Sequence, residues 1–435
     1  MPSIIVRKPT DRINMLVALP RSKSVAARAA IIASMAVPQG PRKLGEDEPF
    51  ELKDFPNSDD SATLKRLLDE RPHVMHCGMG GTTLRFLLAW AAIRDGEEHI
   101  LTGDARLLER PHQALVDALR QLGADIEQVP EGYRVRGRKL AGGEVTMDTP
   151  ASSQFISALM MIGPMMENGI LIHWHGPRLS EPYIMMTMII MKQFNADSSM
   201  GFQPHRHVAA ENGGYSFPEE PFSIPTDWSA ASFIYQIIAT APGARATLNH
   251  LDHDSFQGDE AIRYLLKDEV ETADWVDDGI GPDTLYTTLV HRTMRPVREG
   301  QYTFDLMYTP DIFPMLAITQ AMLGRSARFT GLDSLPLKES DRIAGISDAL
   351  GQLGIPCTSG PGWFEVASST ELIAALADRA FTFNPRGDHR MAMALAPLSL
   401  VCELITIEDP GVVTKSYPGF WEDIGKAGFR LERKE

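Results

Sequence analysis

The pattern of hydrophobic and polar positions predicts six helices that are apolar on nearly every side. Helices of this kind are stable only when most of their circumference is buried. A short polar motif rich in Ser, Thr, Asp or Gly precedes each of them, as is typical of helix N-termini. The buried helices are expected at residues 25–36, 84–93, 155–166, 230–241, 315–323 and 391–401.

Six further segments carry apolar residues on one face at helical spacing and predict amphipathic helices. Several of them are followed by Gly or Asn and then by a strand-like alternation. The chain thus repeats buried helix, strand, amphipathic helix and strands about six times, which predicts an α/β fold. The amphipathic helices are expected at residues 61–70, 111–122, 182–194, 257–266, 340–353 and 418–426.

The length of 435 residues exceeds what one ordinary hydrophobic core accommodates, so two domains are expected. Three of the repeats precede about residue 225 and three follow, and residues 217–221 carry prolines and charges that suit a crossover between domains. Ligands of paired α/β domains tend to bind between the domains. We therefore expect the polar helix starts to face a cleft.

The composition narrows the classes of function. The formal net charge is −15 without any block or stripe of Lys and Arg, which argues against nucleic-acid binding. No apolar run reaches the length of a membrane span and the N-terminus has no signal-peptide pattern, so we expect a cytoplasmic protein without membrane contacts. Cys77, Cys357 and Cys402 lie far apart and form no metal spacing, which favours reduced thiols.

Seven basic residues stand in short motifs that open an apolar helix or lie in a loop. A helix N-terminus attracts anions through its free N–H groups and its dipole, and an added cation makes a site for phosphate or carboxylate. The motifs predict a small substrate with several negative charges. The alternative for each motif is a capped helix with solvated basic side chains. The residues are Lys23, Arg28, Arg110, Lys338, Arg342, Arg390 and Lys415.

Uncharged motifs at two other helix starts offer further anion-binding groups. Gly81 lies in a glycine-rich turn that permits close backbone approach but lacks the ending of a nucleotide-binding loop. Ser152, Ser153 and Gln154 open the most apolar helix with two hydroxyls and an amide. A tight turn and a simple cap are the respective alternatives.

Acidic residues at two helix starts are candidates for proton transfer. Asp311 precedes a buried helix, where a carboxylate serves either as a cap or as a base. Lys338 and Glu339 belong to a Lys-Glu-Ser-Asp-Arg run, for which a solvated helix start is the alternative. His389 and Arg390 stand at the mouth of a very apolar helix, which favours a functional role.

Together and in this order, the motifs resemble the 5-enolpyruvylshikimate-3-phosphate synthase (3-phosphoshikimate 1-carboxyvinyltransferase) family, from Leu19 to about Lys426. The resemblance implies a two-domain inside-out α/β barrel of six βαβαββ units, three per domain. Domain one would comprise residues 1–19 and 226–435, domain two residues 20–225, with the active site in the interdomain cleft. The motifs are Pro20-Arg21-Ser22-Lys23-Ser24, residues 101–111, Ser152 to Phe155, Ser180-Glu181-Pro182-Tyr183-Ile184, Gln257 to Asp259, Pro310-Asp311, Lys338 to Arg342 and Asp388 to Met393.

The implied reaction transfers the enolpyruvyl group of phosphoenolpyruvate to the 5-hydroxyl of shikimate 3-phosphate and releases phosphate, by addition and elimination through a tetrahedral intermediate. It belongs to the biosynthesis of chorismate and the aromatic amino acids. The resemblance implies no metal and no cofactor, only these two small-molecule substrates as partners, and a monomer.

The resemblance also assigns residues to roles. The catalytic residues would be Asp311, Lys338, Glu339, Lys23 and His389. Shikimate 3-phosphate would be bound by Lys23, Ser24, Arg28, Ser152, Ser153, Gln154, Ser180, Tyr183, Asp311 and Lys338. Phosphoenolpyruvate would be bound by Lys23, Gly81, Arg110, Gln154, Glu339, Arg342, Arg390 and Lys415.

Four positions depart from the family pattern, and two other interpretations stay open. Arg21 replaces a glycine and Met79 an asparagine near the expected phosphoenolpyruvate site, while Ala27 and Ser334 replace further asparagines. We expect enzymatic activity with altered substrate affinities.

One alternative function is that of the related enolpyruvyl transferase that acts on UDP-N-acetylglucosamine, which has Lys-Asn in place of Lys23-Ser24. The other is a non-catalytic anion-binding protein.

Overall fold

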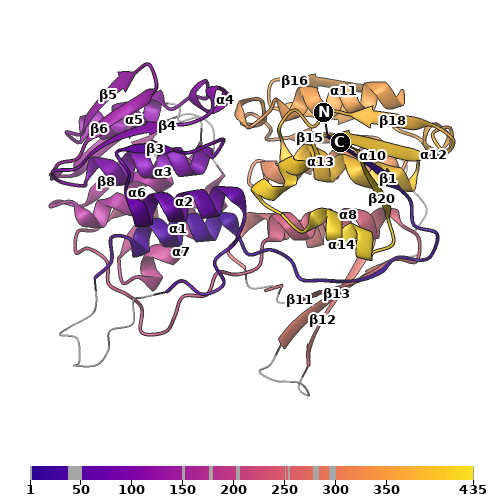
Figure 1. The fold of residues 1–435 in the computed structure, drawn as a ribbon, viewed down its shortest axis with the longest axis horizontal. Helices are drawn as coiled ribbons and strands as arrows, with labels where there is room; N and C mark the ends of the chain where they lie inside the picture. The colour runs from indigo at the N-terminus through magenta and orange to yellow at the C-terminus, as the bar shows by residue number, and fades with distance from the viewer. Residues whose placement is uncertain are drawn as a thin grey trace. The chain divides into compact units, whose positions relative to one another are not determined.

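The computed structural model of the chain describes residues 2–37, 51–148, 152–175, 180–201, 206–249, 251–252, 255–277, 284–292 and 300–434 (Figure 1). The chain divides into two compact units. Met1–Pro20 and Pro225–Glu435 form what we call the discontinuous unit, and Arg21–Ile224 form the inserted unit. These boundaries lie one residue from the expected ones.

Within the described residues, five four-stranded sheets share one pattern of strand pairing. In three of them, β3 to β6, β7 to β10 and β14 to β17, the strands and helices also follow each other in the chain in the βαβαββ order. The first two strands are parallel, the fourth pairs antiparallel with the second, and the third lies beyond the fourth. One sheet of the discontinuous unit has the order β14-β15-β17-β16. Its strands are β14 (Tyr302–Asp305), β15 (Ala327–Thr330), β16 (Cys357–Gly360) and β17 (Trp363–Val366).

The other two sheets of the discontinuous unit use segments that are distant in sequence. The N-terminal strand β1 lies between β19 and β20, so both ends of the chain meet in one sheet. Strand β2 pairs in parallel with β11, although the inserted unit separates the two strands. The strands are β1 (Ser3–Arg7), β18 (Ala380–Phe383), β19 (Leu404–Glu408) and β20 (Arg430–Lys434), and β2 (Asn14–Val17), β11 (Arg245–Asn249), β12 (Val270–Asp277) and β13 (Thr284–His291).

The inserted unit contains two complete repeats among its described residues, with sheet orders β3-β4-β6-β5 and β7-β8-β10-β9. A third repeat is represented by helices α1 and α2 and by the isolated bridges Val37–Ser216 and Lys53–Ser223. Residues 38–50 lie outside the described part, so the sixth βαβαββ unit stays a prediction. The strands are β3 (Val74–His76), β4 (Glu98–Thr102), β5 (Asp125–Val129), β6 (Gly132–Arg136), β7 (Gly143–Met147), β8 (Ile170–Trp174), β9 (Ser198–Gly201) and β10 (Arg206–Ala210).

All six apolar helices predicted from the sequence are present and buried on nearly every side. Four of them begin at a side-chain cap, supplied by Ser22, Ser152, Asp227 and Asp388. The prediction of buried helices is therefore confirmed for all six, and the prediction of a side-chain cap for these four; α3 and α10 begin without a side-chain cap. They are α1 (Lys23–Ala33), α3 (Gly81–Ala92), α6 (Ser153–Ile162), α8 (Trp228–Thr240), α10 (Phe313–Met322) and α13 (His389–Leu395).

In each unit the buried helices pack against one another, α1, α3 and α6 in one and α8, α10 and α13 in the other (Figure 1). In a β-strand–helix connection the helix begins near the carboxyl end of the preceding parallel strand, where backbone N–H groups point outward and favour ligand binding. Packing three such helices together therefore gathers three helix starts within each unit.

The amphipathic helices are also confirmed, with ends within a few residues of the expected positions. Two short helices, α4 (Ala105–Leu108) and α12 (Thr370–Ala374), were not predicted because one turn carries too few residues to show a period. The amphipathic helices are α2 (Asp59–Glu70), α5 (Gln113–Gln121), α7 (Glu181–Gln193), α9 (Ile262–Leu265) after the 3-10 turn η2 (Gly258–Ala261), α11 (Arg342–Leu353) and α14 (Phe420–Lys426).

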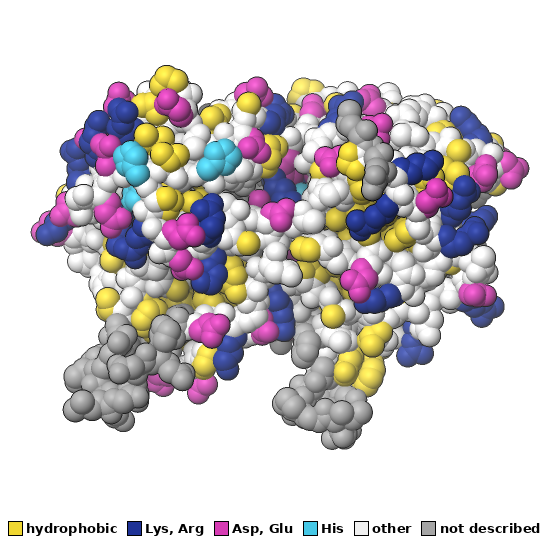
Figure 2. Space-filling model, viewed as in Figure 1, with side chains coloured by type: hydrophobic (Ala, Val, Ile, Leu, Met, Phe, Trp, Pro, Cys, Tyr) yellow, Lys and Arg dark blue, Asp and Glu magenta, His cyan; other side chains and the backbone are white. Residues whose placement is uncertain are grey.

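The distribution of charged side chains on the surface agrees with the expectation from the sequence. Lys and Arg are intermixed with Asp and Glu on the face drawn in Figure 2, without a basic stripe. None of the helices in the described ranges has the length and apolar content needed to cross a membrane.

A buried ion pair links two of the βαβαββ units. Arg325, just before β15, donates to the carboxylate of Glu269, just before β12, and both side chains are almost fully buried. The Arg325 guanidinium also lies 4.8 Å from the centre of the Tyr302 ring. The pair therefore ties two sheets through charges that water cannot reach.

We predict that Glu269→Ala lowers the free energy of unfolding by about 3–5 kcal/mol, because the Arg325 charge would stay buried without its partner. Denaturant unfolding measures this loss. The control is Asp69→Ala, which removes an exposed pair with Lys65 and should cost less than about 1 kcal/mol. Equal losses in the two variants would contradict the prediction.

Candidate active site

Charged side chains gather where the buried helices of the discontinuous unit begin. Asp311 lies in the 3-10 turn η3 (Pro310–Ile312) just before α10, and its side chain does not cap that helix. Its Oδ1 is 3.2 Å from Lys338 Nζ and accepts a hydrogen bond from Arg342 Nη1 at 2.8 Å. Its Oδ2 lies 3.5 Å from Arg390 Nη2. The helix start predicted to supply a base therefore holds a carboxylate in contact with three cations.

Glu339 lies beside the same arginine. Its Oε2 accepts a hydrogen bond from Arg342 Nη2 at 3.0 Å, and its Oε1 is 3.1 Å from Lys415 Nζ. The Nδ1 atom of the buried His389 is 3.5 Å from Oε2. Glu339 thus has a cation at each oxygen and an imidazole close by.

Asp388 completes the surroundings of Arg342. It is fully buried and caps α13 by accepting the N–H of Arg390 at 2.9 Å. Its Oδ2 accepts from Arg342 Nε at 2.7 Å and from the Ser340 hydroxyl at 3.2 Å. Burial alone would lower the pKa of Arg342, but the three surrounding carboxylates raise it. The solvated helix start considered for this motif is excluded, because the Arg342 side chain is only 2% exposed.

Two residues without an assigned role in the sequence complete the cluster. The Arg390 Nη1 is 3.9 Å from Asp259 Oδ2, and its Nη2 donates to the Ser229 hydroxyl at 3.2 Å. The Ser229 hydroxyl in turn donates to Asp259. The sequence indicated Asp259 only as the last residue of the Gln257 to Asp259 motif, and it indicated no role for Ser229, which lies in the first turn of α8. Their role depends on the packing of α8 and η2 beside α13, which no local pattern encodes.

The opposite charges of this group cancel. Among the described residues it contains four basic side chains and four carboxylates, and we call it the charge-balanced cluster. Every basic member contacts a carboxylate, so an incoming anion has to compete with these carboxylates. The members are Lys338, Arg342, Arg390 and Lys415, and Asp259, Asp311, Glu339 and Asp388.

The ionisation of the two aspartates that face Arg390 differs. Burial alone would raise the pKa of Asp311, but Lys338, Arg390 and Arg342 together hold it well below its usual range. Burial raises the pKa of Asp259, Arg390 opposes that rise, and the carboxylate of Asp311 adds to it. Asp311 is therefore the more acidic of the two carboxyl groups and stays ionised at neutral pH.

Glu339, Asp388 and His389 place three potential ligand atoms within 4.8 Å of one another. Arg342 already donates to both carboxylates of this trio. A metal ion there would lie against a guanidinium charge, so the donor set does not suit a cation.

In the inserted unit, the start of α1 carries Lys23 and Arg28. The Lys23 Nζ donates to Asp60 Oδ2 on α2 at 3.0 Å. Arg28 is almost fully buried and donates through Nε to Thr187 at 2.7 Å, and through Nη2 to Ser157 at 3.2 Å. Burial lowers the pKa of Arg28 to about 10. Arg28 has no ion pair with a carboxylate in the described part of the chain.

The serines expected at the shikimate 3-phosphate site occupy helix ends. The Ser152 hydroxyl caps α6 by accepting the N–H of Gln154 at 3.2 Å, so this motif is at least a cap. Ser24 contributes its carbonyl oxygen, which accepts from Arg28 at 2.9 Å. Ser180 stands at the start of α7, and the ring of Tyr183 in its first turn lies 5.8 Å from the Arg28 guanidinium.

Arg110 lies directly over the start of α3. A Cβ atom at Gly81 would come within 2.4 Å of Arg110 Nη1 and 2.9 Å of its Cζ. The position therefore requires glycine for the guanidinium to reach the helix start. Arg110 is 9% exposed, so it has little other space into which to move.

Arg21, which departs from the family pattern just before α1, forms an ion pair with an aspartate. Sequence reasoning placed the charge of Arg21 beside the phosphoenolpyruvate site. The Arg21 Nη2 lies 3.3 Å from Asp54 Oδ2, which also accepts from the Ser223 hydroxyl at 2.6 Å. Asp54 therefore offsets the added charge. Met79 is half-buried in the turn before α3, Ala27 is buried in α1 and Ser334 is half-buried before α11.

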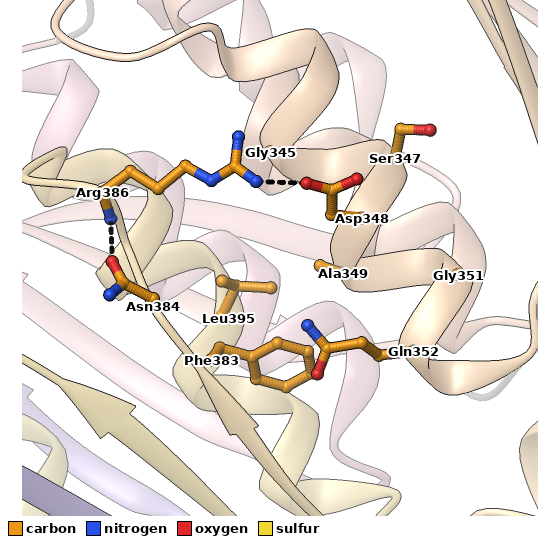
Figure 3. Close-up of a pocket in the computed structure, with 10 residues that line it drawn as sticks. All are labelled: Gly345, Ser347, Asp348, Ala349, Gly351, Gln352, Phe383, Asn384, Arg386 and Leu395. Atoms are coloured by element: carbon orange, nitrogen blue, oxygen red, sulfur yellow. Dashed lines mark hydrogen bonds and ion pairs between the residues drawn. The ribbon is translucent and has the colours of Figure 1, made fainter.

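A pocket elsewhere in the discontinuous unit holds none of the expected site residues. It has a volume of about 450 Å³ and lies between the outer face of α11 and the segment after β18 (Figure 3). An ion pair between Asp348 and Arg386 borders it, and the ring of Phe383 lies on its apolar side (Figure 3). The expected residues form two groups instead, one at the helix starts of each unit.

Comparison with known sequences points to one family. The profile described as EPSP synthase (3-phosphoshikimate 1-carboxyvinyltransferase) matches residues 59–424. A 3-phosphoshikimate 1-carboxyvinyltransferase of Bacteroides fragilis is 35% identical over 427 residues, or 97% of each chain. The protein of the same name from Syntrophobacter fumaroxidans is 30% identical over 96% of this chain and 98% of its own length.

Solved structures have the same fold at low sequence identity. An EPSP synthase of Acinetobacter baumannii superimposes with a TM-score of 0.73 at 21% identity and covers 100% of both chains. The enolpyruvyl transferase NikO of Streptomyces tendae gives a TM-score of 0.70 at 15% identity, covering 100% of this chain and 99% of its own. The fold is thus that of the enolpyruvyl transferases, and on the sequence matches the chain belongs to the EPSP synthase family.

Proposed function

We propose that the protein transfers the enolpyruvyl group of phosphoenolpyruvate to the 5-hydroxyl of shikimate 3-phosphate and releases phosphate. Family membership supports the reaction. The observation that carries the residue roles is the contact of the ionised Asp311 carboxylate with Lys338 at 3.2 Å, at a gathering of helix starts. The product belongs to the biosynthesis of chorismate and the aromatic amino acids.

The reaction brings two anions together, so the protein has to supply positive charge and orientation. We propose that the charge-balanced cluster and the helix starts of the inserted unit act on the substrates jointly, as the two sides of an interdomain site. Neither group alone contains all the expected residues. Shikimate 3-phosphate would bind to Lys23, Ser24, Arg28, Ser152, Ser153, Gln154, Ser180, Tyr183, Asp311 and Lys338.

The attacking hydroxyl has to lose its proton as its oxygen bonds to C2 of phosphoenolpyruvate. We assign this proton to Asp311, the ionised carboxylate, with Lys338 as the neighbouring charge that stabilises the developing alkoxide. Burial alone would raise the pKa of Asp311, but Lys338, Arg390 and Arg342 lower it, which keeps the carboxylate in the ionised state that a proton acceptor needs. Such positioned acid–base groups contribute about 10²–10⁴-fold to a rate.

The methylene carbon of phosphoenolpyruvate gains a proton in the addition step and loses one when phosphate leaves. We assign this proton to Glu339, with His389 3.5 Å away as its neighbour. Both oxygens of Glu339 contact cations, Arg342 at 3.0 Å and Lys415 at 3.1 Å. A substrate anion that binds these cations would weaken their hold on Glu339 and so favour its protonation.

The cations then hold the carboxylate and the departing phosphate, as charged donors fixed before the reaction. We propose that phosphoenolpyruvate binds to Lys23, Gly81, Arg110, Gln154, Glu339, Arg342, Arg390 and Lys415, with Lys23 taking part in the chemistry. We infer further that the enzyme is a cytoplasmic monomer that needs no cofactor, as the family resemblance implies.

Mixing the protein with both substrates and measuring phosphate tests the proposal. The wild type is expected to release phosphate, and Asp311→Asn to lower kcat by about 10²–10⁴-fold because the base is lost. The control is Asp348→Asn, an exposed aspartate that pairs with Arg386 outside the cluster.

The outcomes separate the alternatives. Binding of both substrates by the wild type without phosphate release would favour a non-catalytic anion-binding protein. Release with UDP-N-acetylglucosamine in place of shikimate 3-phosphate would favour the related transferase.

A second prediction concerns the close contact of Gly81 with Arg110. Gly81→Ala should raise the KM for phosphoenolpyruvate about tenfold, equivalent to ~1.4 kcal/mol, because the new methyl group displaces the guanidinium. The KM for shikimate 3-phosphate should change less. The matched control is Gly351→Ala on α11, where nothing lies within 4 Å of the added Cβ. An unchanged KM for phosphoenolpyruvate in Gly81→Ala would remove Arg110 from that pocket.

A third prediction concerns Arg21. Because Asp54 offsets its charge in a partly exposed pair, Arg21→Gly should change either KM by less than about threefold and cost no more than about 1 kcal/mol of stability. Steady-state kinetics and denaturant unfolding check both values. A tenfold fall in the KM for phosphoenolpyruvate would mean that Arg21 hinders the site.

A further inference from the structure

Arg85 is a buried cation at the start of α3 for which the reaction described above has no role. It stands one turn after Gly81 and is 3% exposed. Its guanidinium lies 5.1 Å from the centre of the Phe155 ring on α6. Its side chain therefore sits between the two helices whose starts carry Gly81 and Gln154.

The contacts of Arg85 lead to the expected site residues. Its Nη1 donates to Gln154 Oε1 at 2.6 Å, and its Nη2 donates to the carbonyl oxygen of Pro111 at 3.4 Å. Pro111 directly follows Arg110. The Nε2 of Gln154 in turn donates to the Thr82 hydroxyl at 3.0 Å. Arg85 thus touches the amide of one expected ligand and the backbone beside another.

Arg85 has no carboxylate partner in the described ranges, and its buried Nε has no hydrogen-bond partner there. Burial lowers its pKa, and the nearby charge of Arg110 lowers it further, yet a guanidinium stays protonated at neutral pH. Arg325, equally buried, is neutralised by Glu269. An unpaired buried charge costs several kcal/mol, so packing alone does not account for Arg85.

We propose that Arg85 is a positioning residue of the phosphoenolpyruvate pocket, which fixes the carboxamide of Gln154 with its N–H groups toward the substrate and adds uncompensated positive charge behind it. The inference rests on the proposed function, since Gln154 and Arg110 are its assumed ligands. On this proposal, the bound phosphoenolpyruvate anion supplies the negative charge that Arg85 lacks in the protein.

The direction of the carboxamide follows from the chemistry of its neighbours. An arginine only donates hydrogen bonds, so the amide atom that faces Arg85 has to be the oxygen. The nitrogen then points away, gives one N–H to Thr82 and keeps a second N–H for a substrate anion. Without Arg85 the carboxamide is free to rotate by half a turn, and its oxygen would repel the same anion.

Two substitutions of Arg85 separate orientation and charge from structure. Arg85→Gln keeps a polar side chain that either donates or accepts, so it no longer fixes Gln154, and the KM for phosphoenolpyruvate should rise at least tenfold while kcat falls less. Arg85→Lys keeps the charge and a donor, and should recover most of that affinity. The matched control is Arg325→Gln, which removes an equally buried arginine and should lower the melting temperature without changing either KM.

A double-mutant cycle with Gln154→Ala tests whether Arg85 acts through Gln154. Gln154→Ala should raise the KM for phosphoenolpyruvate in the wild type but add little in the Arg85→Gln background. Multiplicative effects, or equal KM values in Arg85→Lys and Arg85→Gln, would overturn the proposal.

Protection by inorganic phosphate keeps this test independent of turnover. Millimolar phosphate should raise the melting temperature of the wild type, Arg85→Lys and Arg325→Gln, and much less that of Arg85→Gln. Equal protection of Arg85→Gln and the wild type would refute the role of Arg85. A wild type that is protected but releases no phosphate from the two substrates would refute the proposed function and leave the role of Arg85 in anion binding supported.

Discussion

Arg342 holds the charge-balanced cluster together, because three carboxylates from three different segments meet on its one guanidinium. Asp311 precedes α10, Glu339 precedes α11 and Asp388 caps α13. All three carboxylates accept hydrogen bonds from the Arg342 guanidinium. Removing Arg342 would leave several carboxylates facing each other in a medium that screens them poorly. Asp311, Glu339 and the helix-capping Asp388 are thus held in register by a single residue.

Buried basic side chains have different partners in the two units. In the discontinuous unit, all four basic members of the charge-balanced cluster already contact carboxylates. In the inserted unit, Arg28 and Arg85 have hydroxyl, carbonyl, amide and aromatic neighbours but no described carboxylate. These neighbours orient the guanidinium groups without cancelling their charge, which leaves a net attraction for anions.

Much of the fold follows from the sequence because its determinants are local. Apolar runs with Ser or Asp at their starts specify where four of the six buried helices begin, and Ser22, Ser152 and Asp388 act as caps in the structure. The choice of ion-pair partners is not local. Arg21 meets Asp54, and Arg390 meets Asp259 and Ser229, because distant segments pack together. The sequence suggested a cation beside the site at Arg21, whereas the identity of its partner depends on the path of the chain after α1.

The repeated βαβαββ unit explains how the two units carry different groups of side chains at equivalent helix starts. Each βαβαββ unit brings the start of a buried helix to the end of a parallel strand, and the core lies behind the first turn of that helix. Gly81 leaves room for Arg110, and Arg85, one turn further on, reaches back along the helix to orient Gln154. On the proposal above, two residues of one helix thus control an anion site, Gly81 from its open side and Arg85 from its buried side.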